Sequence, residues 1–182
     1  MCEECRFGEI ERRKQCRLII RKEMFVLLLS DVRRKTERSI DFYTEAGKIA
    51  EDPDVKEAIE SRAFVATKSL DKIDEAFRLI NQKPVTLSGR TEEVFVEDFR
   101  REVAEIKSPV VRRIFVLSKL MHLTHWRIGE YMALVAAADT TGHYGVGVLL
   151  ESCLGDYLAF VERNRRIIRK VVELKAATRA GA

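Results

Sequence analysis

The chain has 182 residues, of which 46% are hydrophobic and 34% are charged, and its net charge is +4. This length suits one domain with its own hydrophobic core, while nine glycines and three prolines are too few for a β-sandwich, a barrel or a disordered chain. Only Gln15, Asn81, Gln82 and Asn164 carry side-chain amides. Many charges with so few amides are typical of thermophilic proteins. The composition thus predicts a soluble, helical, thermophilic protein, and it indicates no particular chemistry.

We expect neither a membrane span nor a secretory signal in this chain. Apolar runs such as Met24–Leu29, with six residues, are far short of the roughly 20 that a spanning helix needs. The charges of Arg21, Lys22 and Glu23 interrupt any apolar region that a signal peptide would require. A cytoplasmic protein without a membrane partner is therefore predicted.

Apolar residues recur at the helical period along most of the chain. The first long helix is expected over 24–50, and its stripe includes Thr36 and Tyr43. Asp52 and Pro53 form a cap and first turn for a second long helix that ends near 80, and Arg62 lies on its stripe. A short helix follows over 91–106, and long helices are expected over 109–138 and 146–175. The inward positions expected in the helix at 109–138 are Ile114, Leu117, Met121, His125, Ile128, Met132 and Val135.

Four long amphipathic helices bury their apolar stripes most economically by packing together as an antiparallel four-helix bundle. The short helix at 91–106 lies in the connection between the second and third long helices. That connection could run the length of the bundle, as one crossover does in ferritin-like folds. We divide the chain into a basic, cysteine-containing extension over 1–22, helical and continuous with the first long helix, and a bundle domain over 23–182.

Two features near the ends of the chain each have two interpretations. Cys2 and Cys5 form a C-x-x-C pair that, with Cys16, could bind zinc or form a disulfide. Cys153 lies on an apolar helix face and is expected in the core. Residues 162–182 contain seven Lys or Arg against two Glu. Such a segment could bind nucleic acid, or it could be a solvated helix end, where cations suit the negative end of the helix dipole.

A search for the ligands of a dinuclear metal centre gives a negative result. Ferritin-type iron or manganese sites use two Glu-x-x-His motifs and two further Glu residues that point into the bundle. The residues three positions before His122, His125 and His143 are lysine, histidine and threonine. The sequence therefore contains no ordinary ferritin-type site.

Five segments carry a resemblance to a known family: Phe25–Asp31, Asp52–Ile59, Leu70–Glu75, His125–Tyr131 and Leu149–Leu154. By their order and spacing, residues 24–168 resemble the YciE/YciF-type ferritin-like proteins, a family of bacteria and archaea that is associated with stress responses. The resemblance implies the ferritin-like bundle and association of chains, often as a homodimer. In this chain an interface could include Leu18, Ile19, Phe25 and Leu29.

The resemblance also implies that most metal-ligand positions of the family are replaced here. The replaced positions, where the family has acidic residues or histidine, are Thr36, Arg62, Val65, Thr124 and Arg127. An inward guanidinium needs a carboxylate partner, and Glu37, Glu130 and Asp156 are candidates. The hypothesis is that salt bridges occupy a degenerate metal site. The alternative is that Arg62 and Arg127 extend outward past the helix contacts.

The leading interpretation is a ferritin-like protein without catalytic residues that has lost its dinuclear site, needs no cofactor, and acts through self-assembly or partner binding. The first alternative is a non-standard iron- or manganese-binding oxidoreductase that uses His122, His125 and Glu130, because two imidazoles one helical turn apart can chelate a metal. The second alternative is nucleic-acid binding through the basic C-terminal helix.

Overall fold

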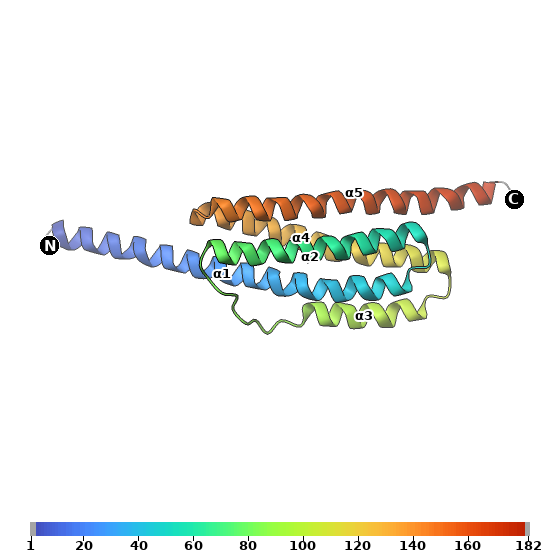
Figure 1. The fold of residues 1–182 in the computed structure, drawn as a ribbon, viewed down its shortest axis with the longest axis horizontal. Helices are drawn as coiled ribbons and strands as arrows, with labels where there is room; N and C mark the ends of the chain where they lie inside the picture. The colour runs from blue at the N-terminus through green and yellow to red at the C-terminus, as the bar shows by residue number, and fades with distance from the viewer. Residues whose placement is uncertain (1–2, 181–182) are drawn as a thin grey trace.

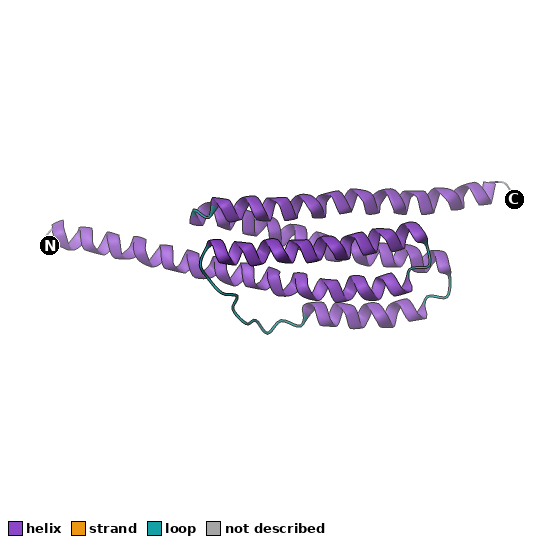
Figure 2. Ribbon diagram, in the orientation of Figure 1, coloured by secondary structure: helices purple, strands orange, loops and turns teal. Residues whose placement is uncertain are grey.

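The computed structural model describes the backbone of residues 3–180 and the side chains of residues 22–173. Its described part is made of helices joined by short loops (Figure 2). In chain order the helices are α1 (Glu3–Ile49), α2 (Pro53–Leu79), α3 (Thr91–Glu105), α4 (Pro109–Thr141) and α5 (Tyr144–Ala180). The predicted helices are all present, and the N-terminal extension is continuous with α1 as expected.

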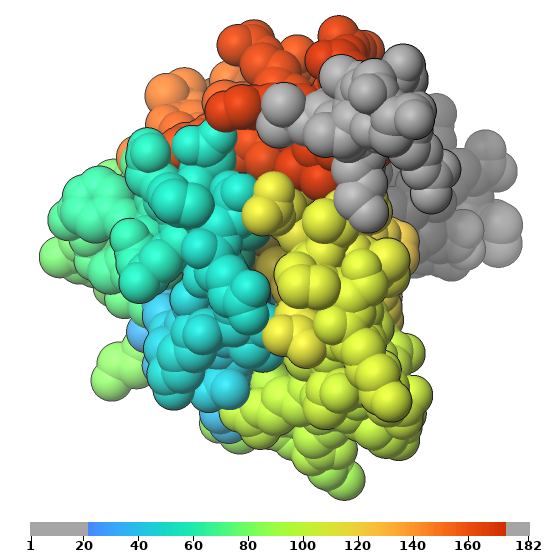
Figure 3. Space-filling view, turned by 90° about the vertical axis from the view of Figure 1, so that its right-hand side faces the viewer, coloured from blue at the N-terminus to red at the C-terminus, as the bar shows by residue number. Residues whose placement is uncertain are grey.

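The four long helices form two antiparallel hairpins that pack on each other. α1 pairs with α2 and α4 pairs with α5, while α2 also contacts α5 and α1 also contacts α4. The connection from α2 to α4 crosses the length of the bundle and contains α3, which lies beside α1 and α4 (Figures 1 and 3). This confirms the predicted all-α, ferritin-like antiparallel four-helix bundle with a short extra helix in the connection.

Local sequence signals explain where the helices begin and end. The Asp52 carboxylate accepts a hydrogen bond from the backbone N–H of Val55 at 3.1 Å, and Pro53 occupies the first turn of α2. Gly142 ends α4 with φ of 77°, in the left-handed region that glycine tolerates. Only Gly142 and His143 separate α4 from α5, so the break between these helices is shorter than the predicted ranges of 109–138 and 146–175 indicated.

The interior consists of two hydrophobic clusters, one toward each end of the bundle. One cluster is built around Phe42, Phe99 and Leu117, and the other around Phe25, Leu134 and Leu150. Along α1 the second cluster ends at Val32 and the first begins at Phe42, and along α4 the first ends at Leu123 and the second begins at Tyr131. The middle of each long helix between these limits is where polar side chains are buried.

The predicted inward face of α4 is correct at Leu117 but is wrong by about one residue in the second half of the helix. His125 and Met132 are exposed, whereas Thr124, Arg127 and Tyr131 are buried. One residue rotates the helix by 100°, so the apolar stripe predicted from the sequence lies beside the buried face that carries Arg127. By contrast, the predicted stripe of α2 is buried from Val55 to Ala76, and Arg62 is included.

α5 is more apolar than the lengths of the uninterrupted apolar runs in the sequence indicated. By length and composition alone its segment Tyr144–Glu173 could cross a membrane, with a mean hydropathy of 1.3 over its best window. The helix instead contributes Leu150, Cys153 and Tyr157 to the core, although only 33% of that window is buried. A substantial apolar surface of α5 therefore remains uncovered in the single chain.

The N-terminal third of α1 projects beyond the bundle (Figure 1). Phe25 and Leu29, which were expected at an interface, are fully buried in the core of the same chain. Leu18 and Ile19 lie outside the residues whose side chains are described, so their part in an interface stays a prediction, as does the domain boundary at residue 22.

Candidate functional site: a polar layer in the bundle centre

A layer of buried polar side chains crosses the middle of the bundle, where the two hydrophobic clusters meet, and its tyrosines pack in those clusters. Every long helix contributes to this polar layer. Its members are Thr36, Ser39 and Tyr43 from α1, Arg62 and Ser69 from α2, Thr124, Arg127 and Tyr131 from α4, and Tyr157 and Asn164 from α5. Several hydroxyl groups are satisfied within their own helix, as when Thr124 donates to the carbonyl of Leu120 at 2.7 Å.

The polar layer contains most of the positions that the resemblance marks as replaced metal ligands. Thr36, Arg62, Thr124 and Arg127 are each at most 1% exposed, and Val65 is half-buried beside the layer. Both arginines thus point inward, and the alternative that they extend outward past the helix contacts is wrong.

Arg127 is held by two carboxylates. Its Nη2 donates to Oε1 of Glu92 at 2.8 Å, and its Nη1 donates to Glu130 from the next turn of α4. Glu130 was among the expected partners. Glu92 comes from the first turn of α3 and is only 3% exposed. The crossover connection therefore supplies a buried carboxylate to the bundle centre, which the sequence analysis missed.

The ion pairs of Arg127 continue into a network that reaches the surface between α1 and α3. Lys35 bridges Glu130 and Asp31 at 2.6 Å each. Arg34 contacts Asp31 at 3.0 Å and Glu92 at 3.4 Å. With Arg127, the network contains three cations and three carboxylates, so its formal charges cancel.

The network shifts the ionisation of its members. Burial tends to raise the pKa of Asp31, but the hydrogen bonds from Lys35 and Arg34 outweigh this effect and hold that pKa below its usual value. Burial tends to lower the pKa of Lys35, and the carboxylates of Asp31 and Glu130 reverse this, so the ammonium pKa is raised. Both shifts favour the charged forms.

Arg62 has none of these partners. Its three guanidinium nitrogens are buried and form no hydrogen bond with any described residue. Instead its Cζ lies 3.7 Å from the ring centroid of Tyr157, with the rings of Tyr43 and Phe160 further away at 5.4 and 5.9 Å. Arg62 is thus a cation held against aromatic faces.

The carboxylates expected beside Arg62 are engaged elsewhere. Glu37 is exposed and lies 3.6 Å from Arg33, while Asp156 pairs with Lys72 at 3.1 Å. The predicted salt bridges of the bundle centre are therefore present at Arg127 and absent, within the described residues, at Arg62.

The tyrosines around Arg62 have unused hydroxyls. The hydroxyls of Tyr43, Tyr131 and Tyr157 are buried and have no hydrogen-bond partner among the described side chains and backbone. Burial raises the pKa of Tyr157 and Tyr131 well above the usual value for a phenol. The hydroxyls of Tyr131 and Tyr157 therefore remain protonated at neutral pH, and each can donate a hydrogen bond.

The donor set of the polar layer does not fit a ferritin-type metal pair. Such a centre needs carboxylates that bridge two cations and a histidine for each metal, whereas this layer presents two guanidinium groups, hydroxyls and one ion-paired Glu92. No group of three or more His, Cys, Asp or Glu in the described part of the chain is arranged to hold a metal ion.

His125 and Glu130 line one surface hollow between α1 and α4, and His122 is not among its lining residues. His122 and His125 are exposed on the outer side of α4, and His125 Nδ1 lies 2.8 Å from the carbonyl oxygen of Met121. Both carboxylate oxygens of Glu130 are engaged by Lys35 and Arg127. A metal on the two histidines alone stays a prediction.

The remaining predicted sites lie near the ends of the chain. The side chains of Cys2, Cys5 and Cys16 are outside the described residues, so their zinc or disulfide role stays a prediction. Cys153 is a free, buried thiol, as expected. In the basic segment, Arg163 and Lys170 contact Glu57 and Asp54 of α2.

Together, the hairpin pairing, the long crossover and the buried polar layer define a ferritin-like helical-bundle protein whose central positions are rich in arginine and tyrosine. Comparison with known proteins narrows this class. Residues 21–177 match the family described as "Domain of unknown function (DUF892)", and the chain belongs to that family, the YciF-type proteins expected from the sequence.

Solved structures agree with this assignment. The stress protein YciF of E. coli is similar with a TM-score of 0.79 at 18% identity, over 84% of this chain and 97% of that one. YcfI of Rhodopseudomonas palustris gives a TM-score of 0.76 at 17% identity, over 80% and 92%. A protein of Xanthomonas campestris gives 0.64 at 19%, over 86% and 99%. At these identities the likeness establishes the fold. No curated protein matches the chain significantly.

Proposed function

We propose that this chain is a self-assembling helical-bundle protein of a stress-associated family, in which an arginine-centred polar layer replaces the dinuclear metal centre. The observation that carries the proposal is the donor set of the polar layer. Arg62 and Arg127 project into the place where cations would lie, and a guanidinium repels a cation and offers it no lone pair. The similarity to YciF of E. coli, which is described as a stress protein, supports the association with stress.

Surface composition supports the proposed assembly. Large apolar side chains of α5 lie open to solvent, with Tyr144 68%, Val148 65% and Leu158 52% exposed. Uncovered apolar surface of this kind commonly marks a contact with another chain. We therefore infer that a second copy covers the outer face of α5 in a homodimer. A cytoplasmic location is part of the proposal, since the apolar inner side of α5 is accounted for by the bundle core.

Light scattering after size-exclusion chromatography tests the assembly. The wild-type chain is expected at twice its 21.0 kDa mass. The double variant Val148→Glu, Leu158→Glu is expected at the monomer mass with unchanged helical circular dichroism, because two charges on the contact face would be desolvated. The matched control is Phe64→Glu on α2, where the side chain is 64% exposed, and this variant should remain dimeric. A wild-type monomer, or dissociation only in the control, would contradict the proposed interface.

Metal analysis tests the replacement of the dinuclear centre. Protein produced with added iron and manganese and then dialysed should retain far less than one metal ion per chain. Two tightly held ions per chain would contradict the proposal. One ion that disappears in the His122→Ala, His125→Ala variant would instead support the metal-binding alternative on the outer side of α4.

A further inference from the structure

The charge of Arg62 has no counter-charge in the described structure. The side chain is 1% exposed, and its Nε, Nη1 and Nη2 lack hydrogen-bond partners there. A buried cation without a partner costs several kcal/mol, and the neighbouring network of Arg127 cannot offset it because its three cations already balance its three carboxylates. A stable fold therefore calls for a negative charge from another source.

The surroundings of Arg62 define where that charge would lie. The Tyr157 ring covers one face of the guanidinium at 3.7 Å, and the N–H bonds, which lie in the guanidinium plane, are not directed at that ring. A guanidinium donates and never accepts. The unused hydroxyls of Tyr43 and Tyr157 belong to the two rings nearest to Arg62 in the polar layer, and a phenolic hydroxyl can donate a hydrogen bond to an acceptor.

Neither the tyrosines nor water provides the missing charge. The pKa values of Tyr131 and Tyr157 are raised, chiefly by burial, so both phenols are neutral at pH 7. Water can accept hydrogen bonds, but it leaves the positive charge of Arg62 uncompensated. A single negative charge balances Arg62, whereas a dianion would leave a buried negative charge.

We propose that the centre of the bundle is a binding site for one small monovalent anion, held in the guanidinium plane of Arg62 with Tyr43 and Tyr157 as further donors. The ligand class is a halide or a small carboxylate-like oxyanion such as formate or bicarbonate, which suits the planar fork of the guanidinium. This site goes beyond the proposed function, and it is independent of whether the chain forms a dimer.

Thermal unfolding in different sodium salts at constant ionic strength and fixed urea concentration tests the site. An anion that binds only the folded protein stabilises it in proportion to the logarithm of its concentration. We expect Tm to rise by about 3–6 °C for each tenfold increase in chloride above its dissociation constant. Gluconate, which is too large for a buried site, should give no such rise. Parallel series with formate and bicarbonate distinguish the oxyanions from the halide.

Arg62→Met isolates the guanidinium, because methionine fills similar space without charge. This variant is expected to lose the chloride dependence and to melt above the wild type in gluconate, where the wild type has a buried, uncompensated cation. The matched control is Arg163→Met on α5, whose guanidinium is 40% exposed and pairs with Glu57. It should keep the wild-type anion dependence. Persistence of that dependence in Arg62→Met would overturn the proposal.

Crystals of the unmodified protein grown in bromide give a second test that needs no variant. The expected result is an anomalous peak in contact with the guanidinium of Arg62. If no anion raises Tm and no such peak is present, ordered water alone occupies the site and the proposal is wrong. The mass and metal measurements are separate, so failure of the anion site is distinguishable from failure of the proposed function.

Discussion

The two arginines of the polar layer differ in whether a carboxylate compensates their charge. Arg127 is compensated by Glu92 and Glu130, whereas Arg62 stacks on Tyr157 and has no carboxylate partner in the described part of the chain. A buried ion pair adds little net stability when formed, because desolvation opposes the attraction, but removing one partner is costly. The stability of the bundle therefore depends on Glu92 more than on any exposed acidic residue.

The first prediction concerns that carboxylate. Glu92→Gln should lower the free energy of unfolding by about 3–5 kcal/mol, because it leaves Arg127 partly unpaired in the core. Urea unfolding followed by circular dichroism measures the loss. Glu93→Gln is the matched control, since Glu93 is 39% exposed and pairs with exposed Arg90, and it should cost no more than about 1 kcal/mol. Equal losses in the two variants would show that the buried pair has no special role.

The second prediction concerns pH and Asp31. Its pKa in the folded state is below the usual value, because the hydrogen bonds from Lys35 and Arg34 outweigh the opposite effect of burial. The unfolded chain therefore takes up this proton first as the pH falls. The stability that Asp31 contributes is complete above about pH 4 and is lost as the pH decreases through the folded-state pKa.

Asp31→Asn should be less stable than the wild type at pH 7 and should lose less stability between about pH 5 and about pH 2. Urea midpoints across that range provide the measurement. Asp71→Asn serves as the control, because Asp71 is 65% exposed, and it should keep the wild-type slope. An unchanged slope in Asp31→Asn would refute this assignment of the acid sensitivity.

At this scale the sequence allows a partial prediction of the site. Arg62 interrupts an apolar stripe that is otherwise regular from Val55 to Ala76, so its inward direction follows from helical periodicity. Glu130 lies one turn from Arg127 and is also accessible to that reasoning. The position of Glu92 cannot be predicted from helical periodicity, because it depends on how a long connection returns to the bundle. Its neighbour Glu93 has the same residue type and remains at the surface.

At the scale of elements, α3 is part of the bundle core as well as of the connection between α2 and α4. Its Phe99 is fully buried, with its ring 4.9 Å from that of Phe42 and 6.3 Å from that of Phe115. The same helix delivers Glu92 to Arg127. The loop before it is fixed as well, since the N–H of Val85 donates to Ser30 at 3.0 Å and Arg34 donates to the carbonyl of Gly89 at 2.7 Å. α3 is therefore an integral fifth element of the core.

The third prediction follows from this role. Phe99→Ala should reduce the free energy of unfolding by about 3–5 kcal/mol, because it leaves a cavity between α1, α3 and α4. Hydrogen exchange should show the largest loss of protection over 91–105. Val94→Ala, at a side chain that is 45% exposed on the same helix, should change both quantities little. Unaltered exchange of α3 in Phe99→Ala would mean that the helix is held mainly by the Glu92 ion pairs.

Element boundaries were predicted well because caps and periodicity are local properties. Asp52, Pro53 and Ser108-Pro109 mark starts that the structure reproduces. The face of α4 was harder, because this helix has apolar residues on several sides. Tertiary packing selected the face with Arg127 and Tyr131, and no local signal ranks a face that contains a buried charge above a more apolar one.

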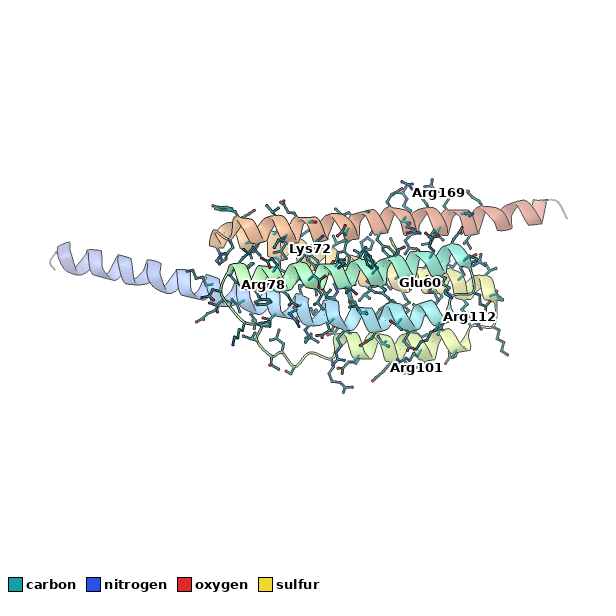
Figure 4. All side chains as sticks on the ribbon, viewed as in Figure 1. Glu60, Lys72, Arg78, Arg101, Arg112 and Arg169 are labelled. Atoms are coloured by element: carbon teal, nitrogen blue, oxygen red, sulfur yellow. The ribbon has the colours of Figure 1, made fainter. Side chains whose placement is uncertain are left out.

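At the scale of the whole molecule, positive charge gathers at one end of α5. The segment over 162–182 carries seven basic and two acidic residues, or +5, which exceeds the +4 of the entire chain and leaves about −1 for the rest. In the described part of this segment, Arg163 contacts Glu57 at 2.8 Å and Arg166 contacts Glu162 at 3.3 Å. Arg169 lies on the outer side of α5, away from the bundle (Figure 4). Many of the basic side chains described in this segment therefore form ion pairs with α2 or within α5 itself.

The fourth prediction is that this surface does not bind nucleic acid appreciably at physiological salt. Phosphate binding requires cations whose charge is not already matched, and its affinity falls steeply with salt. Mobility shifts of a labelled DNA duplex and of single-stranded RNA should be absent at micromolar protein near 0.15 M salt. In the Asp54→Asn, Glu57→Gln variant, which removes the partners of Lys170 and Arg163, a weak shift should emerge at low salt and disappear as salt is raised. A strong salt-dependent shift by the wild type, abolished by Arg165→Glu and Arg169→Glu together, would instead make the C-terminal helix a nucleic-acid interface and displace assembly as the leading role of α5.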